Sequence, residues 1–348
     1  MARLAVVLFN LGGPDRPEAI RPFLFNLFND PAIIGAPSLI RRAIAWLIST
    51  RRAPAAQHIY AHLGGRSPLL ELTRQQATAL QTALAAGEDE VRVFIAMRYW
   101  HPLTEQTVAE VRAWKPERVV LLPLYPQYST TTSASSISAW KRAAAEAGLG
   151  APTVSICCYP TEDGLILAQA DLLRQCLAEI EHSPAGVRVL FSAHGLPKSV
   201  VERGDPYPLH VEMTAKAIVK ELGMPDLDWR ICYQSRVGPL EWIGPSTDAE
   251  IRQAGEAGKA LVVQPVAFVS EHSETLVELD IEYARVAKEL GVPVYRRVPA
   301  VGSHPAFVGA MADLVRRSLI AGCDPCSEKG GRICPGSVRR CAQAGGLG

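Results

Sequence analysis

Residues 187–197, Val-Arg-Val-Leu-Phe-Ser-Ala-His-Gly-Leu-Pro, decide the fold class of this chain. An apolar run of strand length ends in a polar residue and is followed by glycine and proline, which turn the chain. Residues 3–14, Arg-Leu-Ala-Val-Val-Leu-Phe-Asn-Leu-Gly-Gly-Pro, have the same form. The pair indicates an internal repeat, although two unrelated first strands would resemble each other in the same way.

Similar apolar runs continue through both halves and alternate with segments long enough for crossover helices. They are Leu4–Phe9, Val91–Met97, Arg118–Leu124, Thr153–Cys158, Val187–Ser192, Trp229–Tyr233, Ala260–Val266 and Val292–Arg296. Continuous apolar runs are typical of parallel strands buried on both faces. The pattern therefore predicts an α/β protein with two similar, doubly wound Rossmann-like domains, each with a parallel four-stranded sheet.

We expect the first domain at residues 1–160, the second at 161–320, and a cysteine-rich tail at 321–348. Ligands of open α/β sheets bind beyond the carboxyl ends of the strands. Two such domains facing each other would place the active-site cleft between them.

The composition excludes several classes of protein. The chain has 348 residues, with 36 Lys and Arg against 35 Asp and Glu, and a net charge of +1. This balance argues against a nucleic-acid partner. The first residues are typical of a β-strand rather than a signal peptide, and no apolar stretch is long enough to span a bilayer. We therefore expect a cytoplasmic protein with reduced thiols. The sequence leaves the oligomeric state open and is compatible with a homodimer.

His194 is a candidate general base because it lies at the carboxyl end of a predicted strand, before a Gly-Leu-Pro turn. A histidine there has little conformational freedom, and its ordinary pKa suits proton abstraction near neutral pH. A histidine that only hydrogen-bonds the turn is the alternative.

Three glutamates follow the strand at 260–266. Glu274, Glu278 and Glu282 are spaced four apart and share one face of a predicted helix, with no Lys or Arg between residues 270 and 283. A row of carboxylates on one helix face is suited to passing protons from one group to the next or to conducting a hard divalent cation. The alternative is that these are solvent-exposed acidic residues at the start of a helix, where the macrodipole favours negative charge. This explains Glu274 better than Glu282, which lies two turns into the helix.

Three loops that follow predicted strands are rich in aromatic and hydroxyl side chains. They are residues 97–105, with Arg98 and Tyr99; residues 124–132, with Tyr125; and residues 233–245. Such loops suit a large, flat, partly apolar ligand that carries acidic groups.

The segment Ile33–Arg52 combines apolar side chains with Arg41, Arg42, Arg51 and Arg52. It predicts a helix that rests on a membrane surface through residues 33–48 or forms one lip of an apolar cleft. An amphipathic helix that faces the core is the alternative.

The tail holds four cysteines in a Gly- and Pro-rich segment: Cys323, Cys326, Cys334 and Cys341. Four thiolates suffice for a 2Fe-2S cluster or for tetrahedral Zn²⁺.

Several of these motifs together resemble the ferrochelatase family. The matching blocks are Asn-Leu-Gly-Gly-Pro at 10–14, Gly-Gly-Arg-Ser-Pro at 64–68, Leu-Tyr-Pro-Gln-Tyr-Ser at 124–129, Ser-Ala-His-Gly-Leu-Pro at 192–197, Gln-Ser-Arg-Val-Gly-Pro at 234–239 and Glu-His-Ser-Glu-Thr-Leu-Val-Glu-Leu-Asp at 271–280. The resemblance implies a chelatase fold and a lyase that inserts Fe²⁺ into protoporphyrin IX as the terminal step of haem biosynthesis.

The resemblance also implies a role for each matching position. His194 and Glu274 would face each other across the porphyrin, where they would receive the substrate Fe²⁺, with Glu278 and Glu282 behind Glu274. Arg98 and Tyr99 would form the opposite wall, on a path for metal or protons. The porphyrin-binding positions would be Tyr60, Ser67, Arg51 or Arg52, Tyr125, Gln234, Ser235 and Trp242. Ile34 stands where some members have methionine, so no soft sulfur ligand is expected there.

The resemblance favours a 2Fe-2S cluster over Zn²⁺ in the tail, with Cys323, Cys326, Cys334 and Cys341 as ligands. Because some family members use a distant internal cysteine, it also implies Cys176 as an alternative fourth ligand. It also implies a peripheral enzyme at the inner face of the cell membrane. Three alternatives stay open: a coproporphyrin III ferrochelatase, a chelatase for another metal or tetrapyrrole, and a haem-binding or iron-sensing protein.

Overall fold

The computed structural model describes residues 2–85, 90–180, 183–236, 238 and 240–344. The chain divides into two compact units. The first comprises Met1–Cys158, Met311–Ile333 and Ala342–Gly348, and the second comprises Tyr159–Ala310 and Cys334–Cys341. The tail, expected as a region of its own, is thus distributed between the two units.

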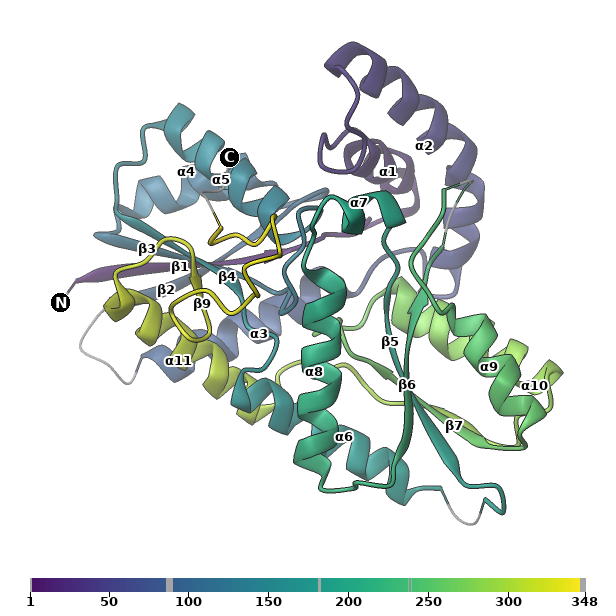
Figure 1. The fold of residues 1–348 in the computed structure, drawn as a ribbon. Helices are drawn as coiled ribbons and strands as arrows, with labels where there is room; N and C mark the ends of the chain where they lie inside the picture. The colour runs from purple at the N-terminus through teal and green to yellow at the C-terminus, as the bar shows by residue number, and fades with distance from the viewer. Residues whose placement is uncertain (1, 86–89, 181–182, 237, 239, 345–348) are drawn as a thin grey trace. The chain divides into compact units, whose positions relative to one another are not determined.

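A parallel sheet forms the centre of the first unit (Figure 1). Its strands, in spatial order, are β2 (Glu90–Met97), β1 (Arg3–Asn10), β3 (Arg118–Pro123), β4 (Thr153–Cys158) and β9 (Cys326–Ser327). β1 is buried along almost its whole length and pairs with a parallel neighbour on each side. This burial explains why its sequence is apolar without alternation.

Helices cover both faces of this sheet (Figure 1). α4 (Thr104–Trp114) and α5 (Ser133–Ala147) pack on one face through a core cluster that includes Val111, Ile137 and Trp140. α3 (Leu69–Leu84) and α11 (Pro305–Ala321) lie on the other face. The remaining helices of this unit follow β1: η1 (Pro17–Ala19), α1 (Ile20–Phe28) and α2 (Ser38–Ala61).

The second unit repeats this plan with a four-stranded parallel sheet. The strands, in spatial order, are β6 (Asp228–Gln234), β5 (Val187–His194), β7 (Ala260–Pro265) and β8 (Tyr295–Arg297). α6 (Asp163–Ala178) and α8 (Tyr207–Leu222) contact one face through residues such as Leu173 and Val211. α9 (Thr247–Glu256) and α10 (Ala284–Glu289) contact the other face. α7 (Lys198–Glu202) is a short helix after β5.

Counted along the chain, the first four strands of each unit have the same spatial order: second, first, third, fourth. The two similar segments, 3–14 and 187–197, form the first strand and following loop of their units. The predicted α/β class with two doubly wound sheets is confirmed. One detail was wrong: the first sheet has a fifth strand, β9, contributed by the tail.

The helix predicted from about residue 273 is a π-helix, η2 (Glu274–Tyr283), which continues directly into α10. A π-helix has a wider turn than an α-helix and is frequently found at functional sites. The wider turn brings residues four apart closer to alignment along one line.

Candidate active site

The second unit brings His194 and Glu274 together at the point where its strand order reverses. β5 and β7 are neighbours in the sheet, but the chain leaves β5 toward one edge and β7 toward the other. His194 is the last residue of β5, and the loop after β7 leads into Glu274 at the start of η2. Such switch points are where open α/β sheets bind ligands.

The ring of His194 is held in one tautomer. Its Nδ1 lies 2.6 Å from the carbonyl oxygen of Gly195. Because a carbonyl oxygen only accepts, Nδ1 carries the hydrogen in this contact, and Nε2 of the neutral ring has a free lone pair. Nε2 lies 3.8 Å from Glu274 Oε1. The arrangement gives a proton acceptor next to a carboxylate that stabilises the protonated ring.

Glu274 lies between two histidines. His272 Nε2 is 3.7 Å from Glu274 Oε2, whereas His194 lies near Oε1. Burial raises the pKa of Glu274, but the two imidazoles outweigh this effect and hold the pKa at about 2. The carboxylate therefore stays ionised when either ring takes up a proton.

Glu278, one turn further along η2, is held by the end of β6. Its Oε1 accepts a hydrogen bond from the Ser235 backbone N–H at 2.8 Å. Its Oε2 accepts from the Ser235 hydroxyl at 2.5 Å and from Gln234 Nε2 at 3.1 Å. Burial and the charge of Glu274 raise the pKa of Glu278, against the hydrogen bonds from Ser235. Glu282, a further turn along, is exposed, so the three glutamates lead from the site to solvent.

Gln234 and Ser235, predicted as porphyrin contacts, thus contact Glu278 directly. Gln234 is fully buried, and its Oε1 accepts a hydrogen bond from Ser192 at 2.7 Å. Ser235 adopts a φ of 61°, which is uncommon for a residue with a side chain. The indole ring of Trp242 lies 6.4 Å from the His194 ring, centroid to centroid, and is partly exposed.

In the first unit, Arg98 and Tyr99 follow β2 and both contact Asp30. Arg98 Nη2 lies 2.8 Å from Asp30 Oδ2, and the Tyr99 hydroxyl donates to the same oxygen at 2.8 Å. Tyr99 is only 2% exposed. Burial and the Asp30 charge raise the pKa of Tyr99 well above its ordinary value. Tyr99 is therefore a neutral hydrogen-bond donor in this arrangement.

Two other predicted porphyrin contacts, Ser67 and Tyr60, lie beside the loop after β1. Ser67 donates its backbone N–H to the Pro14 carbonyl at 2.7 Å, and a Cβ on Gly13 would lie 2.5 Å from the Ser67 side chain. Tyr60 is buried in the cluster that contains Tyr99. Tyr125 follows β3, and burial raises the pKa of its hydroxyl.

Two comparisons identify the family. The family model described as Ferrochelatase matches residues 3–319. A ferrochelatase of Caulobacter vibrioides is 56% identical over 319 residues, which cover 91% of this chain and 90% of that protein. The chain belongs to the ferrochelatase family. A ferrochelatase of Phenylobacterium zucineum is 55% identical over 344 residues, covering 98% of each chain.

A solved structure shares the chelatase fold. SirB from Bacillus subtilis, solved with Fe³⁺, has a TM-score of 0.50 and 13% identity, covering 91% of this chain and 96% of SirB. At this identity the likeness concerns the fold alone. The predicted ferrochelatase family, the chelatase-type α/β fold and the assignment as a lyase of the terminal iron-insertion step are confirmed. The roles of individual residues stay predictions.

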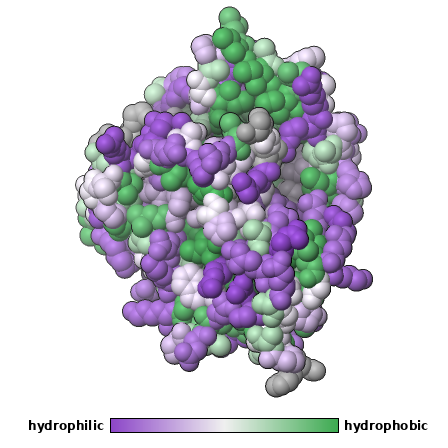
Figure 2. Space-filling model, turned by 45° about the vertical axis from the view of Figure 1, so that its right-hand side comes forward, coloured by the Kyte–Doolittle hydropathy of each residue, from purple (hydrophilic) through white to green (hydrophobic). Residues whose placement is uncertain are grey.

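This ferrochelatase exposes apolar side chains on and before α2. Leu39 is 83% exposed, Ile40 and Trp46 are each 55% exposed, and Ile33 and Leu47 are also exposed. Figure 2 shows hydrophobic surface at the top of the view, where Figure 1 places α2. Within the described residues, no helix is long and apolar enough to cross a membrane.

The two arginines near the middle of α2 differ in their surroundings. Arg51 is exposed. The guanidinium of Arg52 lies 5.6 Å from the centre of the Phe28 ring, and partial burial lowers its pKa. Arg51 is thus the freer of the two to bind a carboxylate.

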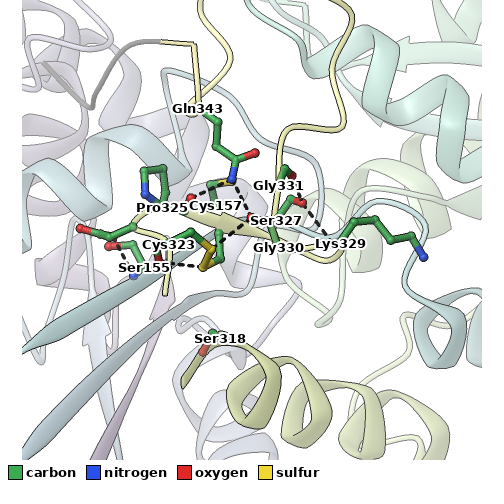
Figure 3. The surroundings of a disulfide bond; sticks show 12 residues. Ser155, Cys157, Ser318, Cys323, Pro325, Ser327, Lys329, Gly330, Gly331 and Gln343 are labelled. Atoms are coloured by element: carbon green, nitrogen blue, oxygen red, sulfur yellow. Dashed lines mark hydrogen bonds between the residues drawn. A yellow bond between two sulfur atoms is a disulfide. The ribbon is translucent and has the colours of Figure 1, made fainter. Parts of the chain in front are cut away.

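The tail cysteines of this ferrochelatase occupy different surroundings. Cys323 and Cys326 form a disulfide beside β4 (Figure 3). Cys334 and Cys341 are buried in the second unit, where Cys334 Sγ lies 3.2 Å from His210 Nε2. Cys176 packs in the core cluster of α6 and α8. In the described part of the chain, no group of three or more His, Cys, Asp or Glu is placed to hold a metal ion.

Sequence reasoning missed two residues of this ferrochelatase site. His272 stands inside the block that contains Glu274, so attention to the histidine as well as the carboxylates would have found it. Asp30 precedes Pro31 in a segment without any charge pattern, and no signal in the sequence pairs it with Arg98.

Proposed function

We propose that this ferrochelatase inserts Fe²⁺ into protoporphyrin IX to give protohaem and two protons, with His194 as the base. The single observation that carries the proposal is the fixed tautomer of His194, whose Nε2 lone pair lies beside the ionised Glu274. A free porphyrin has two pyrrole N–H groups that must lose their protons as iron enters. A neutral imidazole with an adjacent carboxylate is suited to accept them in turn.

In this mechanism, Glu274 stabilises the protonated His194 ring and does not carry the proton itself, because its pKa is about 2. Glu278, whose pKa is raised, takes up a proton more readily. Its oxygens already accept three hydrogen bonds, which supports a proton path through the glutamates rather than an iron path. Glu282 would release the proton to solvent.

The first test is an anaerobic chelation assay with Fe²⁺ that offers protoporphyrin IX and coproporphyrin III side by side. Faster turnover of protoporphyrin is expected. Preference for coproporphyrin would keep the chemistry but overturn the substrate, and preference for another metal would indicate a different chelatase. Tight porphyrin binding without metallation of either substrate would overturn the catalytic role in favour of a haem-binding or iron-sensing protein.

The apolar surface of α2 supports docking at the inner face of the cell membrane from the cytoplasm. Leu39 and Ile40 lie together in its first turn, next to Arg41 and Arg42. Apolar side chains flanked by arginines suit a surface of anionic lipid. The test is sedimentation with vesicles of anionic phospholipid. The Leu39→Ser/Ile40→Ser variant should lose binding, whereas Ile320→Ser, at a residue that is 85% exposed on α11, should not. Equal loss in both variants would contradict docking through α2.

The tail cysteines suit a 2Fe-2S cluster held by Cys323, Cys326, Cys334 and Cys341. Cys326, Cys334 and Cys341 are buried, and reduction of the Cys323–Cys326 disulfide would supply two of the four soft thiolates that such a cluster takes. The test is the iron, acid-labile sulfide and zinc content of protein purified without oxygen. Iron and sulfide should be lost in Cys341→Ser and kept in Cys176→Ala, whose thiol lies in the core. A colourless protein loaded with zinc would overturn the cluster.

A further inference from the structure

Asp30 is a buried carboxylate on which several donors converge. It is 3% exposed and follows α1. Its Oδ2 accepts hydrogen bonds from the Tyr99 hydroxyl at 2.8 Å and the Ser135 hydroxyl at 2.5 Å, and lies 2.8 Å from Arg98 Nη2. The three donors come from two separate parts of the unit, the loop after β2 and the helix α5. A buried carboxylate with this many donors holds its neighbours in a fixed arrangement.

The other side of Asp30 organises the segment that leads to α2. Its Oδ1 accepts from the Ala32 backbone N–H at 2.9 Å, and its carbonyl oxygen accepts from Ile33 and Ile34 at 3.0 and 2.9 Å. Arg41 of α2 joins the two ends of the same segment, because its guanidinium donates to the carbonyl oxygens of Asn29 and Ala36, each at 2.8 Å. Residues 31–37 are therefore held at both ends.

Arg98 and Tyr99 have little capacity left for a metal ion. The Tyr99 hydroxyl is buried and donates to Asp30, and the raised pKa of Tyr99 opposes the phenolate that a metal would prefer. The Arg98 guanidinium also donates from Nε to the Ser135 hydroxyl at 2.8 Å. An arginine cannot be a metal ligand while it is charged. Both side chains instead act on the segment 31–37 through Asp30.

We propose that Asp30 is a positioning residue for porphyrin binding, which joins the segment 31–37 to Arg98 and Tyr99 and so sets the conformation of the apolar lip. The proposal rests on the proposed function and on the predicted place of the segment Ile33–Arg52 as one lip of the cleft that takes the porphyrin. It removes Arg98 and Tyr99 from the metal path and gives them a role in binding the macrocycle.

The test compares steady-state kinetics of Asp30→Asn with those of wild type, varying porphyrin and Fe²⁺ separately. The KM for porphyrin should rise about tenfold or more, because the loss of one charged partner leaves Arg98 unpaired and releases the segment. The KM for Fe²⁺ and kcat should change far less. Asp15→Asn is the matched control, since Asp15 is an exposed aspartate of the same unit that contacts Trp100. Equal effects on both KM values, or none, would overturn the proposal.

A second pair of variants covers the case in which Asp30→Asn does not fold. Tyr99→Phe and Ser135→Ala each remove one hydroxyl donor to Asp30 and keep the charge pair with Arg98. Each should weaken porphyrin binding, measured by fluorescence quenching without metal, and speed hydrogen exchange of the Ala32 N–H. The two effects should be less than additive in the double variant, because both act through one carboxylate. Additive effects, or unchanged binding and exchange, would overturn the positioning role.

The wild-type protein separates this inference from the proposed function. Wild type that neither binds nor metallates a porphyrin would defeat the proposed function. If wild type metallates porphyrin, and Asp30→Asn, Tyr99→Phe and Ser135→Ala all bind porphyrin as wild type does, the inference is wrong and the proposed function stands.

Discussion

Glu274 and Glu278 lie one turn apart on the same π-helix, yet their pKa values are displaced in opposite directions. His194 and His272 hold Glu274 ionised, whereas Glu278 is buried next to that charge and takes up a proton more readily. Neighbouring titratable groups whose pKa values diverge mark an acid–base assignment. Here the ionised member stabilises charge on the base, and the other is suited to receive protons.

Glu278→Gln should therefore lower kcat by about tenfold to a hundredfold, which is a moderate share of what general acid–base catalysis contributes. Porphyrin binding should change far less than kcat, because the isosteric amide keeps an oxygen that can accept the hydrogen bond from the Ser235 backbone N–H. The measurement is kcat for Fe²⁺ insertion between pH 6 and 9. Glu282→Gln, on the exposed turn of the helix, is the comparison and should have a small effect. Equal rates in wild type and Glu278→Gln would exclude the residue from the proton path.

His194→Ala should lose about a hundredfold to ten-thousandfold in kcat while porphyrin still binds, because the base is removed and the pocket is enlarged by one small ring. Added imidazole should restore part of the rate. His304→Ala is a matched control in the same unit, since His304 also contacts a carboxylate, Asp171, at 3.3 Å. Near-normal turnover in His194→Ala would show that another group accepts the pyrrole protons.

Acid titration should reveal the contribution of Glu274 to stability. Its pKa in the folded protein, about 2, lies below the ordinary value of 4.5, so ionisation is favoured by folding. The stabilisation is complete above about pH 4.5 and is lost as the pH falls toward 2, with an upper size of about 3 kcal/mol. The free energies of unfolding of wild type and Glu274→Gln should therefore converge over that window. A difference that stays constant with pH would contradict the low pKa.

The sequence was sufficient to predict the strands that form the two sheets, because buried parallel strands have apolar runs of the right length. For example, the prediction of 153–158 coincides with β4, while that of 292–296 begins three residues before β8 (Tyr295–Arg297) and ends one residue before its end. β9 was missed because Cys326–Ser327 is too short to show any period and lies in a Gly- and Pro-rich tail. The π-helix was missed because its residue pattern also fits an α-helix.

The sequence predicted those site residues that stand in one recognisable motif. It did not predict the contacts that join distant parts of the chain. His194 follows a strand and Glu274 starts an acidic face, and both features are visible locally. The contacts of Gln234 with Glu278 and of Asp30 with Arg98 are long-range, so no local pattern announces them. The sequence consequently identified Gln234 and Glu278 but not the contact between them, and it identified Arg98 without Asp30.

Arg51 and Arg52 are adjacent on α2, and replacing each by alanine should affect a different property of the protein. Arg51 is exposed, so Arg51→Ala should raise the KM for a porphyrin severalfold by removing one partner of a propionate, with little change in thermal stability. Arg52 packs its guanidinium over Phe28, so Arg52→Ala should lower the melting temperature by a few degrees through lost packing. The measurements are porphyrin KM and thermal unfolding of both variants. A larger KM effect for Arg52→Ala than for Arg51→Ala would reverse the assignment of the carboxylate-binding arginine.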